Sequence, residues 1–242
     1  MSADILVIGD SCRDIFVYCD APRLAPDIPV PVLNIVHQTE NAGMAANVQR
    51  NILKYKTCDL ITNSNWHEIT KTRYVHDGTN HMFVRVDSNQ KIPRFNKDGI
   101  NLDYKVVVIS DYNKGFLNEQ DIARICERHP CVFLDTKKVL GPWAKNAAFI
   151  KINDSEYRAS RNSISKDIED KIIHTMGGEG CEYRGERYPV NKADVKDISG
   201  AGDSFMAGLC IKYIDTKDIV ESIRFANLCA SETVRHRGVT TI

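Results

Sequence analysis

The chain has no excess of charge of either sign. Its 32 Lys and Arg residues balance 32 Asp and Glu residues over 242 positions. No summed positive field is therefore present to hold a polyanion or an anionic membrane surface, and a nucleic-acid function would require a local basic patch. The length and the 43% hydrophobic content suit one large globular domain or two small ones.

The sequence also lacks the patterns of a membrane protein or a metal ribbon. No apolar run approaches the roughly 20 residues that span a bilayer, and the start Met-Ser-Ala-Asp has no basic and then apolar export signal. The eight cysteines are scattered without a CxxC pair, which argues against zinc ribbons and dithiol redox motifs. We therefore expect a cytoplasmic protein with reduced, mostly buried thiols.

Short runs of β-branched residues alternate with helical patterns along most of the chain. Such apolar runs are typical of strands covered on both faces, and a helix is predicted over Glu119–Arg128, where Ile122, Ile125 and Cys126 share one face. The alternation predicts an α/β fold with a mostly parallel central sheet flanked by helices. The predicted strands are 5–8, 106–109, 132–134, 148–150 and 172–173.

A second kind of segment interrupts this alternation. Residues 31–39 alternate between apolar and polar, and Thr70–Val75 and Met82–Asp87 flank Asp77–Asn80, whose composition suits a hairpin turn. Half-exposed antiparallel strands of this kind predict a small β-sheet lid, formed by about 11–40 and 68–90. We interpret the Pro-rich stretch 22–31 as a stiff crossover and not as a linker, so we expect a single domain over 1–242.

The segment Asp197–Phe205 carries the strongest chemical signal. A glycine-rich turn, Gly200-Ala201-Gly202, runs into a helical pattern, and the N–H groups and dipole of a helix start form an anion site. A helix cap alone also explains Asp203. Next to an anion site, however, a carboxylate suits a general base that deprotonates a hydroxyl during phosphoryl transfer. Because the turn lacks the third glycine of a dinucleotide-binding motif, the pattern favours a kinase over a dehydrogenase.

Four motifs in order along the chain resemble those of the ribokinase (PfkB) family of carbohydrate kinases. They are Gly9–Asp14, Gly43–Asn47, Asn153–Glu156 and Asp197–Asp203. Within that family the sequence resembles the kinase half of the bacterial heptose-phosphate kinase/ADP-heptose synthases, and the Pro-rich segment Arg23–Val32 is the most discriminating of the matching pieces. The other pieces are 71–73, 85–87, 110–115 and 134–137. The resemblance implies a ribokinase-like fold with a β-sheet lid.

The resemblance also implies roles for the residues around the acceptor. Asp203 is the implied general base, and the backbone of Gly200, Ala201 and Gly202 would face the transferred phosphoryl group. The residues expected at the sugar hydroxyls or beside them are Asp10, Asp14, Gly43 and Asn47. Asp10 is equally explained as the end of its strand. A phosphate already on the sugar requires a cation. The basic candidates are Lys71, Arg73, Arg85 and Lys114.

A second set of residues is implied to bind ATP and magnesium. Asn153 and Glu156 are expected to hold Mg²⁺ indirectly, because this ion keeps several waters. An N-cap and a first-turn acid are the alternative explanation of these two residues. The turn 175–180 is expected beside the nucleotide, and a plain hairpin turn is the alternative. The remaining candidates for the nucleotide are Lys137, Thr175, Gly177, Gly180, Asp197, Asn227 and Gly238.

The prediction is an ATP-dependent, Mg²⁺-requiring sugar kinase. The resemblance implies the anomeric hydroxyl of heptose 7-phosphate as acceptor, and we expect a homodimer joined through the lid, with no nucleic-acid or membrane partner. Met44 departs from the family pattern because it stands where a glycine pair is usual, and we interpret it as narrowing the sugar pocket or stiffening a hinge. Two alternatives remain: a family kinase for another sugar or a nucleoside, and a non-catalytic binding protein that retains the fold.

Overall fold

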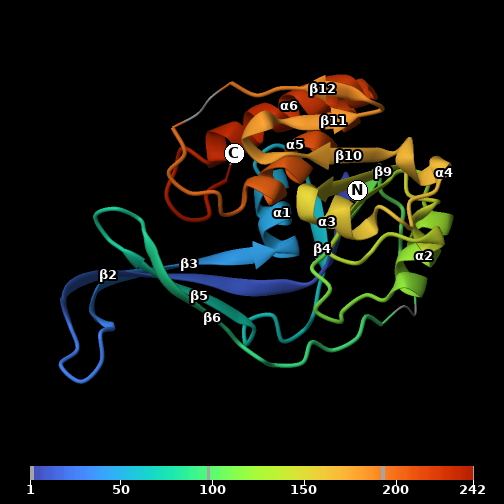
Figure 1. The fold of residues 1–242 in the computed structure, drawn as a ribbon. Coiled ribbons are helices and arrows are strands. Elements are labelled where there is room, and N and C mark those ends of the chain that lie inside the picture. Colours follow the sequence, from blue (N-terminus) through green and yellow to red (C-terminus); the bar gives the residue numbers. More distant parts are fainter. Residues whose placement is uncertain (1–2, 97–98, 192–193, 242) are drawn as a thin grey trace.

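The computed structural model describes residues 3–96, 99–191 and 194–241, which form a larger and a smaller sheet (Figure 1). The main sheet has eight strands in the order β12-β11-β10-β9-β8-β7-β1-β4. Its strands from β10 to β4 run parallel, and β11 and β12 add an antiparallel hairpin at one edge. The bounds are β1 Ile5–Gly9, β4 Cys58–Ile61, β7 Val106–Asp111, β8 Val132–Thr136, β9 Phe149–Asn153, β10 Ile172–Thr175, β11 Cys181–Tyr183 and β12 Glu186–Tyr188.

Helices cover both faces of the main sheet, because successive strand residues point to opposite sides. Ile5 and Val7 pack with α1 (Ala45–Ile52), α5 (Ala201–Thr216) and α6 (Ile219–Thr233). Leu6 and Ile8 belong to the other core, which includes residues of α2 and α4. The elements on that side are α2 Glu119–Arg128, α3 Asp154–Ser160 and α4 Lys166–Glu169, and the short 3₁₀ turns are η1 Pro142–Ala144 and η2 Gly177–Glu179. The α/β prediction is confirmed, although the strand expected at 148–150 begins at Phe149.

The smaller sheet has the order β3-β2-β5-β6 and projects from the body as a lid. Its strands are β2 Ser11–Leu24, β3 Pro31–Met44, β5 Thr70–His76 and β6 Met82–Asp87. The predicted β-sheet lid is confirmed, but the expectation of purely antiparallel strands is wrong. Two antiparallel hairpins, β2–β3 and β5–β6, are joined by a parallel pairing of β2 with β5.

The Pro-rich stretch 22–31 is not a crossover, as the sequence suggested, but the tip of the β2–β3 hairpin. The N–H of Ala25 donates to the carbonyl of Val30 at 2.9 Å and closes the turn. Pro22 lies at a register shift of β2, and Pro31 is the first residue of β3. Bulges and first strand positions tolerate proline because no ladder N–H is required there.

Two backbone junctions connect the lid to the body next to the first turn of α1. Asp10 alone separates β1 from β2, and β3 ends at Met44 directly before α1. Met44 is buried and has φ 63° and ψ −132°, a conformation that suits glycine and is strained for other residues. The N–H of Ala45 donates to the carbonyl of Asp10 at 3.0 Å, so the two junctions are hydrogen-bonded to each other.

Within the described part of the chain, no helix combines the length and the apolar character that crossing a membrane requires.

Candidate active site

Asp203 lies in the first turn of α5 and is buried. The turn before it requires glycine, because Gly200 has φ 82°. One carboxylate oxygen, Oδ2, accepts from Nδ2 of Asn47 at 2.8 Å, and Oδ1 accepts from the hydroxyl of Tyr112 at 2.7 Å. Burial raises the pKa of the Asp203 carboxyl above its usual range, against the opposing effect of these two donors and of Lys151. The carboxylate is therefore held by neutral donors at the start of a helix.

A cavity of about 280 Å³ lies against Asp203, between the lid and the body. Four cationic side chains, here called the basic cluster, line it: Lys71 and Arg73 of β5, Arg85 of β6 and Lys114 of the loop after β7. The structure thus brings together all four cations that the sequence analysis assigned to the acceptor. The remaining lining residues are Asp14, Met44, Tyr112, Ser199, Gly200, Asp203 and Val239.

The members of the basic cluster differ in how their charge is compensated. Arg73 pairs with Asp14 at 2.6 Å, and Arg85 binds both carboxylate oxygens of Asp87 at 2.6 and 2.7 Å. Lys71 is buried and lies over the ring of Tyr112, with 4.7 Å from Nζ to the ring centroid. Within the described residues Lys71 and Lys114 have no carboxylate within salt-bridge distance, so these two ammonium groups are available for an anionic ligand.

Gly43 leaves space for the Asp14 side chain and does not line the cavity. It lies opposite Cys12 in the β2–β3 ladder. A Cβ atom at this position would lie 2.3 Å from Oδ2 of Asp14 and 2.8 Å from Sγ of Cys12. Glycine is therefore needed so that Oδ2 of Asp14 can lie beside β3 while Oδ1 accepts from Arg73 of β5.

The structure gives Asp10 a structural task instead of the sugar contact expected from the sequence. Its side chain is fully buried and is not among the residues that line the cavity. The carboxylate accepts from the N–H groups of Tyr112 at 2.7 Å and Phe116 at 3.2 Å, and so holds the loop after β7. The interpretation of Asp10 as the polar end of its strand is the one that the geometry supports.

A row of alternating charges continues from Asp203 across the carboxyl ends of β8 and β9. An ideal Cβ on Gly202 would lie 3.1 Å from Nζ of Lys151, and Lys151 donates to Oδ2 of Asp135 at 2.7 Å. Lys137 then lies 3.8 Å from Oδ1 of Asp135 and forms an ion pair with Glu156. Burial acts to raise the pKa of Asp135, but Lys151 and Lys137 outweigh it and lower that pKa.

Asn153 and Glu156 form a capping box at the start of α3. The Asn153 side chain accepts from the N–H of Glu156 at 3.0 Å, and the Glu156 carboxylate accepts from the N–H of Asn153 at 2.8 Å. The sequence alternative of an N-cap with a first-turn acid is therefore present in the structure. It does not exclude a ligand, because Glu156 also faces Lys137 at the carboxyl edge of the sheet, where open α/β sheets bind their ligands.

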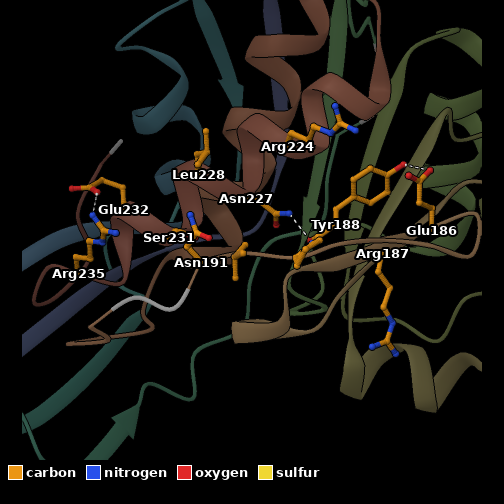
Figure 2. Close-up of a pocket in the computed structure, with 12 residues that line it drawn as sticks. Glu186, Arg187, Tyr188, Asn191, Arg224, Asn227, Leu228, Ser231, Glu232 and Arg235 are labelled. Atoms are coloured by element: carbon orange, nitrogen blue, oxygen red, sulfur yellow. Dashed lines mark hydrogen bonds and ion pairs between the residues drawn. The ribbon is translucent and has the colours of Figure 1, made fainter.

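A larger cavity of about 620 Å³ lies between β12, the loop after it and α6 (Figure 2). Asn227 lines it and donates from Nδ2 to the carbonyl of Tyr188 at 2.9 Å. Arg224 and Ser231 lie along the same helix, and Arg235 lies just after its end, as Figure 2 shows. Asn227, assigned to the nucleotide from the sequence, is thus placed in an open cavity.

The turn 175–180 does not line that cavity. It connects β10 to β11 as a hairpin turn, the alternative that the sequence left open. A Cβ on Gly180 would lie 2.1 Å from the carbonyl oxygen of Tyr188, so the packing of β12 explains this glycine. Gly177 has φ 56° and open space around it, and Thr175 donates to the carbonyl of Ile152 at 3.3 Å.

Asp197 and Gly238 contact each other. Oδ2 of Asp197 accepts from the N–H of Gly238 at 3.0 Å, and Oδ1 accepts from the N–H of Ser199 at 2.9 Å. The pair therefore fastens the C-terminal segment to the turn before α5. Val239, the next residue, lines the cavity beside Asp203.

Tyr112 and Lys151 are two site residues that sequence reasoning did not select. Lys151 interrupts the apolar run Phe149–Ile152 in a strand covered on both faces, and a charged residue in such a place is a usable signal. Tyr112 follows β7 directly, so its position at the end of a strand could be predicted from the sequence. Its contact with Asp203, 91 residues away, could not be predicted from the sequence.

Comparison with known proteins agrees with this geometry. Residues 130–242 match the family model described as pfkB family carbohydrate kinase. The bifunctional protein HldE of Helicobacter pylori strain J99 is 28% identical over 97% of this chain, and that of Campylobacter curvus is 26% identical over 98%. Over its C-terminal part, residues 130–242, the chain is similar to the pfkB family carbohydrate kinases. It spans 63% of the length of each of the two HldE relatives.

Solved kinases of the ribokinase family share the fold of this chain. Ribokinase from Thermotoga maritima superposes with a TM-score of 0.73 at 15% identity, covering 98% of this chain and 95% of the other. A nucleoside kinase from Methanocaldococcus jannaschii gives 0.71 at 16% identity, covering 98% and 93%. The fold of this chain is therefore ribokinase-like.

Kinases of this family use ATP, generally with Mg²⁺, and the residues at the carboxyl edge of the sheet fit this ion. Magnesium takes one or two carboxylates and keeps several waters, with phosphate oxygens as further ligands. No group of three or more His, Cys, Asp and Glu side chains is arranged as a metal site in the described residues. A single carboxylate such as Glu156, with Asn153 beside it, is the donor set that such a loosely held ion requires.

Proposed function

We propose that the chain transfers the terminal phosphoryl group of ATP to a hydroxyl of a phosphorylated sugar, with Asp203 as the general base. The observation that carries this proposal is the position of Asp203. It lies at the start of α5 and lines a cavity that also holds the basic cluster. The family supplies the class of reaction, and the cavity supplies the class of acceptor.

The proposed reaction follows from this arrangement. The acceptor hydroxyl gives its proton to the Asp203 carboxylate, and its oxygen forms a bond to the γ-phosphorus while the bond from that phosphorus to the bridging oxygen breaks. ADP leaves, and the proton remains on Asp203 until solvent removes it. First-turn N–H groups of α5, including those of the Gly200-Ala201-Gly202 turn, stabilise the charge on the group in transfer.

Magnesium would be held near Glu156 and Asn153 and would neutralise charge on the ATP phosphates. Lys137, the ion-pair partner of Glu156, is the nearest cation for those phosphates. The cavity beside Asn227 has the size for an adenosine group. Thr175, Gly177, Gly180, Asp197 and Gly238 remain predicted neighbours of the nucleotide on the strength of the sequence resemblance, since none of them lines this cavity.

For the acceptor we propose heptose 7-phosphate, phosphorylated at its anomeric hydroxyl. Resemblance to the bacterial heptose-phosphate kinase/ADP-heptose synthases and similarity to HldE proteins support this choice. The charge of the cavity supports a phosphorylated acceptor, since Lys71 and Lys114 carry charge that no carboxylate compensates in the described structure. Asp14, which lines the cavity, is the proposed partner of the sugar hydroxyls. Asn47, expected there as well, is fully buried, does not line the cavity and donates to Asp203 instead.

An acceptor panel tests the function. ADP formation is measured with ATP, Mg²⁺ and, in turn, heptose 7-phosphate, ribose, fructose and a nucleoside. We expect the highest kcat/KM with heptose 7-phosphate, and a fall of about a hundredfold to ten-thousandfold in kcat for Asp203→Asn. Asp215→Asn is the control, because Asp215 is exposed and pairs only with Lys56. Equal activity of Asp203→Asn and wild type would refute the general base, and preference for an unphosphorylated acceptor would refute the substrate.

We also propose that two copies associate through the lid. Arg85 lines the cavity, so its neighbours Val84 and Val86 point to the opposite face of β6, where both are exposed. Ile35 of β3, which lies opposite Cys19 in the ladder, is exposed as well, and an uncovered apolar sheet face favours pairing with a second copy. Val84→Asp is expected to convert the dimer to a monomer in sedimentation, whereas a monomeric wild type would refute the proposal.

A reaction that consumes ATP is consistent with the predicted cytoplasmic location.

A further inference from the structure

Tyr112 occupies the point where the lid, the main sheet and Asp203 meet. It is the first residue after β7, and its N–H donates to the buried Asp10 at 2.7 Å, which fixes its backbone. Its hydroxyl donates to Oδ1 of Asp203 at 2.7 Å. The ring lies between two ammonium groups, with Nζ of Lys71 at 4.7 Å and Nζ of Lys137 at 5.3 Å from its centroid. Backbone, ring and hydroxyl are thus each held by a different partner.

The hydroxyl of Tyr112 acts as a donor to a carboxylate. The side chain is half-buried, and its desolvation together with the Asp203 and Asp135 carboxylates raises its pKa well above the usual range, so the phenol keeps its proton. An ionised carboxylate only accepts, and a hydrogen bond from a neutral donor to a charged acceptor is among the stronger ones. The contact therefore stabilises Asp203 in the charged form that a base requires.

The same carboxylate faces charged groups on several other elements. Asp135 of β8 raises the pKa of Asp203, and Lys151 of β9 lowers it. Asp14 of β2 and the basic cluster face it across the cavity. Against this background, Tyr112 and Asn47 are the two neutral side chains with a hydrogen bond to Asp203 in the described structure, one on each oxygen.

We propose that Tyr112 is a positioning residue whose hydroxyl orients the Asp203 carboxylate, and whose ring keeps this hydroxyl in place between a lysine of the lid and a lysine of the body. This inference rests on the proposed kinase function, since it concerns the same base. The ring lies over one ammonium group from the acceptor side, Lys71, and one from the Glu156 side, Lys137. Stacking of a cation on an aromatic face depends on the ring and not on the hydroxyl. The two contributions can therefore be separated by substitution.

Tyr112→Phe removes the hydroxyl and keeps the ring. We expect kcat to fall about tenfold to a hundredfold, as for a lost hydrogen bond to a charged group, with KM for both substrates within about twofold of wild type. The acidic limb of the kcat/KM profile should move by about one pH unit to higher pH, because the carboxylate loses a donor. Tyr112→Leu, which also removes the ring, should in addition raise KM for the acceptor through Lys71.

Tyr104→Phe is the matched control. Its hydroxyl donates to Oδ2 of Asp59 at 2.8 Å, which is also a tyrosine–aspartate pair, but it lines neither cavity. Wild-type kinetics are expected for this variant. Equal kcat and pH profiles for Tyr112→Phe and Tyr104→Phe would overturn the proposal.

A readout without turnover separates this proposal from the kinase function. In protein with ¹³C-labelled aspartate, the carboxyl resonance of Asp203 is assigned by its loss in Asp203→Asn and titrated in wild type and in Tyr112→Phe. A titration shifted to higher pH in Tyr112→Phe supports the orienting contact even if no acceptor is phosphorylated, in which case the proposed function alone fails. An unshifted titration in a folded Tyr112→Phe variant overturns the role of Tyr112, whatever the activity.

Discussion

The guanidinium of Arg237 donates to the backbone carbonyl of Asp77 at 2.8 Å, across 160 residues of sequence. A second bond from the same group reaches the carbonyl of Gly78 at 3.0 Å, so Arg237 binds the turn at the far end of the β5–β6 hairpin. Nδ2 of Asn80, in that turn, donates to the carbonyl of Lys196 on the body. The C-terminal segment and the segment before α5 therefore both fasten the lid.

Arg237→Ala is expected to loosen the lid turn. Arg237 is exposed, so the loss of its two hydrogen bonds is worth about 1 kcal/mol, and amide exchange at 77–80 should become about fivefold faster. Hydrogen exchange measured by mass spectrometry checks this. Arg158→Ala serves as the control, because Arg158 pairs only with Asp154 within α3. Unchanged amide exchange at 77–80 in Arg237→Ala would contradict the conclusion that Arg237 fastens the lid turn.

Lys71→Met and Lys114→Met test the recognition of the acceptor phosphate. Each removes one uncompensated charge of the basic cluster, so KM for heptose 7-phosphate should rise about tenfold to a hundredfold. KM for an unphosphorylated sugar should change little, because such a sugar has no phosphate group for these lysines to bind. Lys105→Met is the control, since Lys105 pairs with Asp4 far from the cavity. A similar KM change for both acceptors would argue against phosphate binding by these lysines.

Gly43→Ala should disturb both the lid and the acceptor cavity. The added Cβ would meet the Asp14 carboxylate at 2.3 Å, and displacing Asp14 also breaks its ion pair with Arg73. We expect a loss of about 1–3 kcal/mol in the free energy of unfolding, measured with urea. Gly178→Ala is the comparison, because a Cβ there meets nothing within 4 Å, and its unfolding should match wild type.

Asp203→Asn should stabilise the fold at neutral pH while it removes activity. Burial raises the folded-state pKa of Asp203 above its ordinary value, so folding disfavours the charged form. The unfolded chain loses its proton first, and stability therefore decreases as pH rises through this window. Thermal denaturation should give Asp203→Asn the higher Tm at pH 7, with the difference vanishing below about pH 4. A Tm difference independent of pH would contradict this assignment.

Local patterns predicted the elements because their signals are themselves local. The helix Glu119–Arg128 was predicted with the bounds it has, since its apolar spacing and the capping box of Asn118 and Asp121 lie within a few residues. The parallel pairing of β2 with β5 was missed, because no local pattern distinguishes the two directions of pairing.

Contacts at the site are a different matter, since most of them are long-range. The hydrogen bond from Asn47 to Asp203 spans 156 residues, and only the order of motifs in a resembling family placed these two residues together. The roles of individual glycines were harder to predict than these contacts. Gly43 and Gly180 were assigned to ligands, but the structure shows that each leaves room for a protein atom, Oδ2 of Asp14 and the carbonyl of Tyr188 respectively. Only coordinates reveal which atom fills the space beside a glycine.

The paired junctions at Asp10 and Met44 have a mechanical consequence. Ser11 lies opposite Met44 in the ladder, and the N–H of Ala45 reaches the carbonyl of Asp10, so both strands leave the body through one hydrogen-bonded pair of peptides. A movement of the β2–β3 hairpin against the main sheet would therefore bend the backbone at this pair, while Arg237 and Asn80 hold the far end of the β5–β6 hairpin to the body. The tip of the β2–β3 hairpin would then move farthest, and Asp14, close to the pair in β2, would move little.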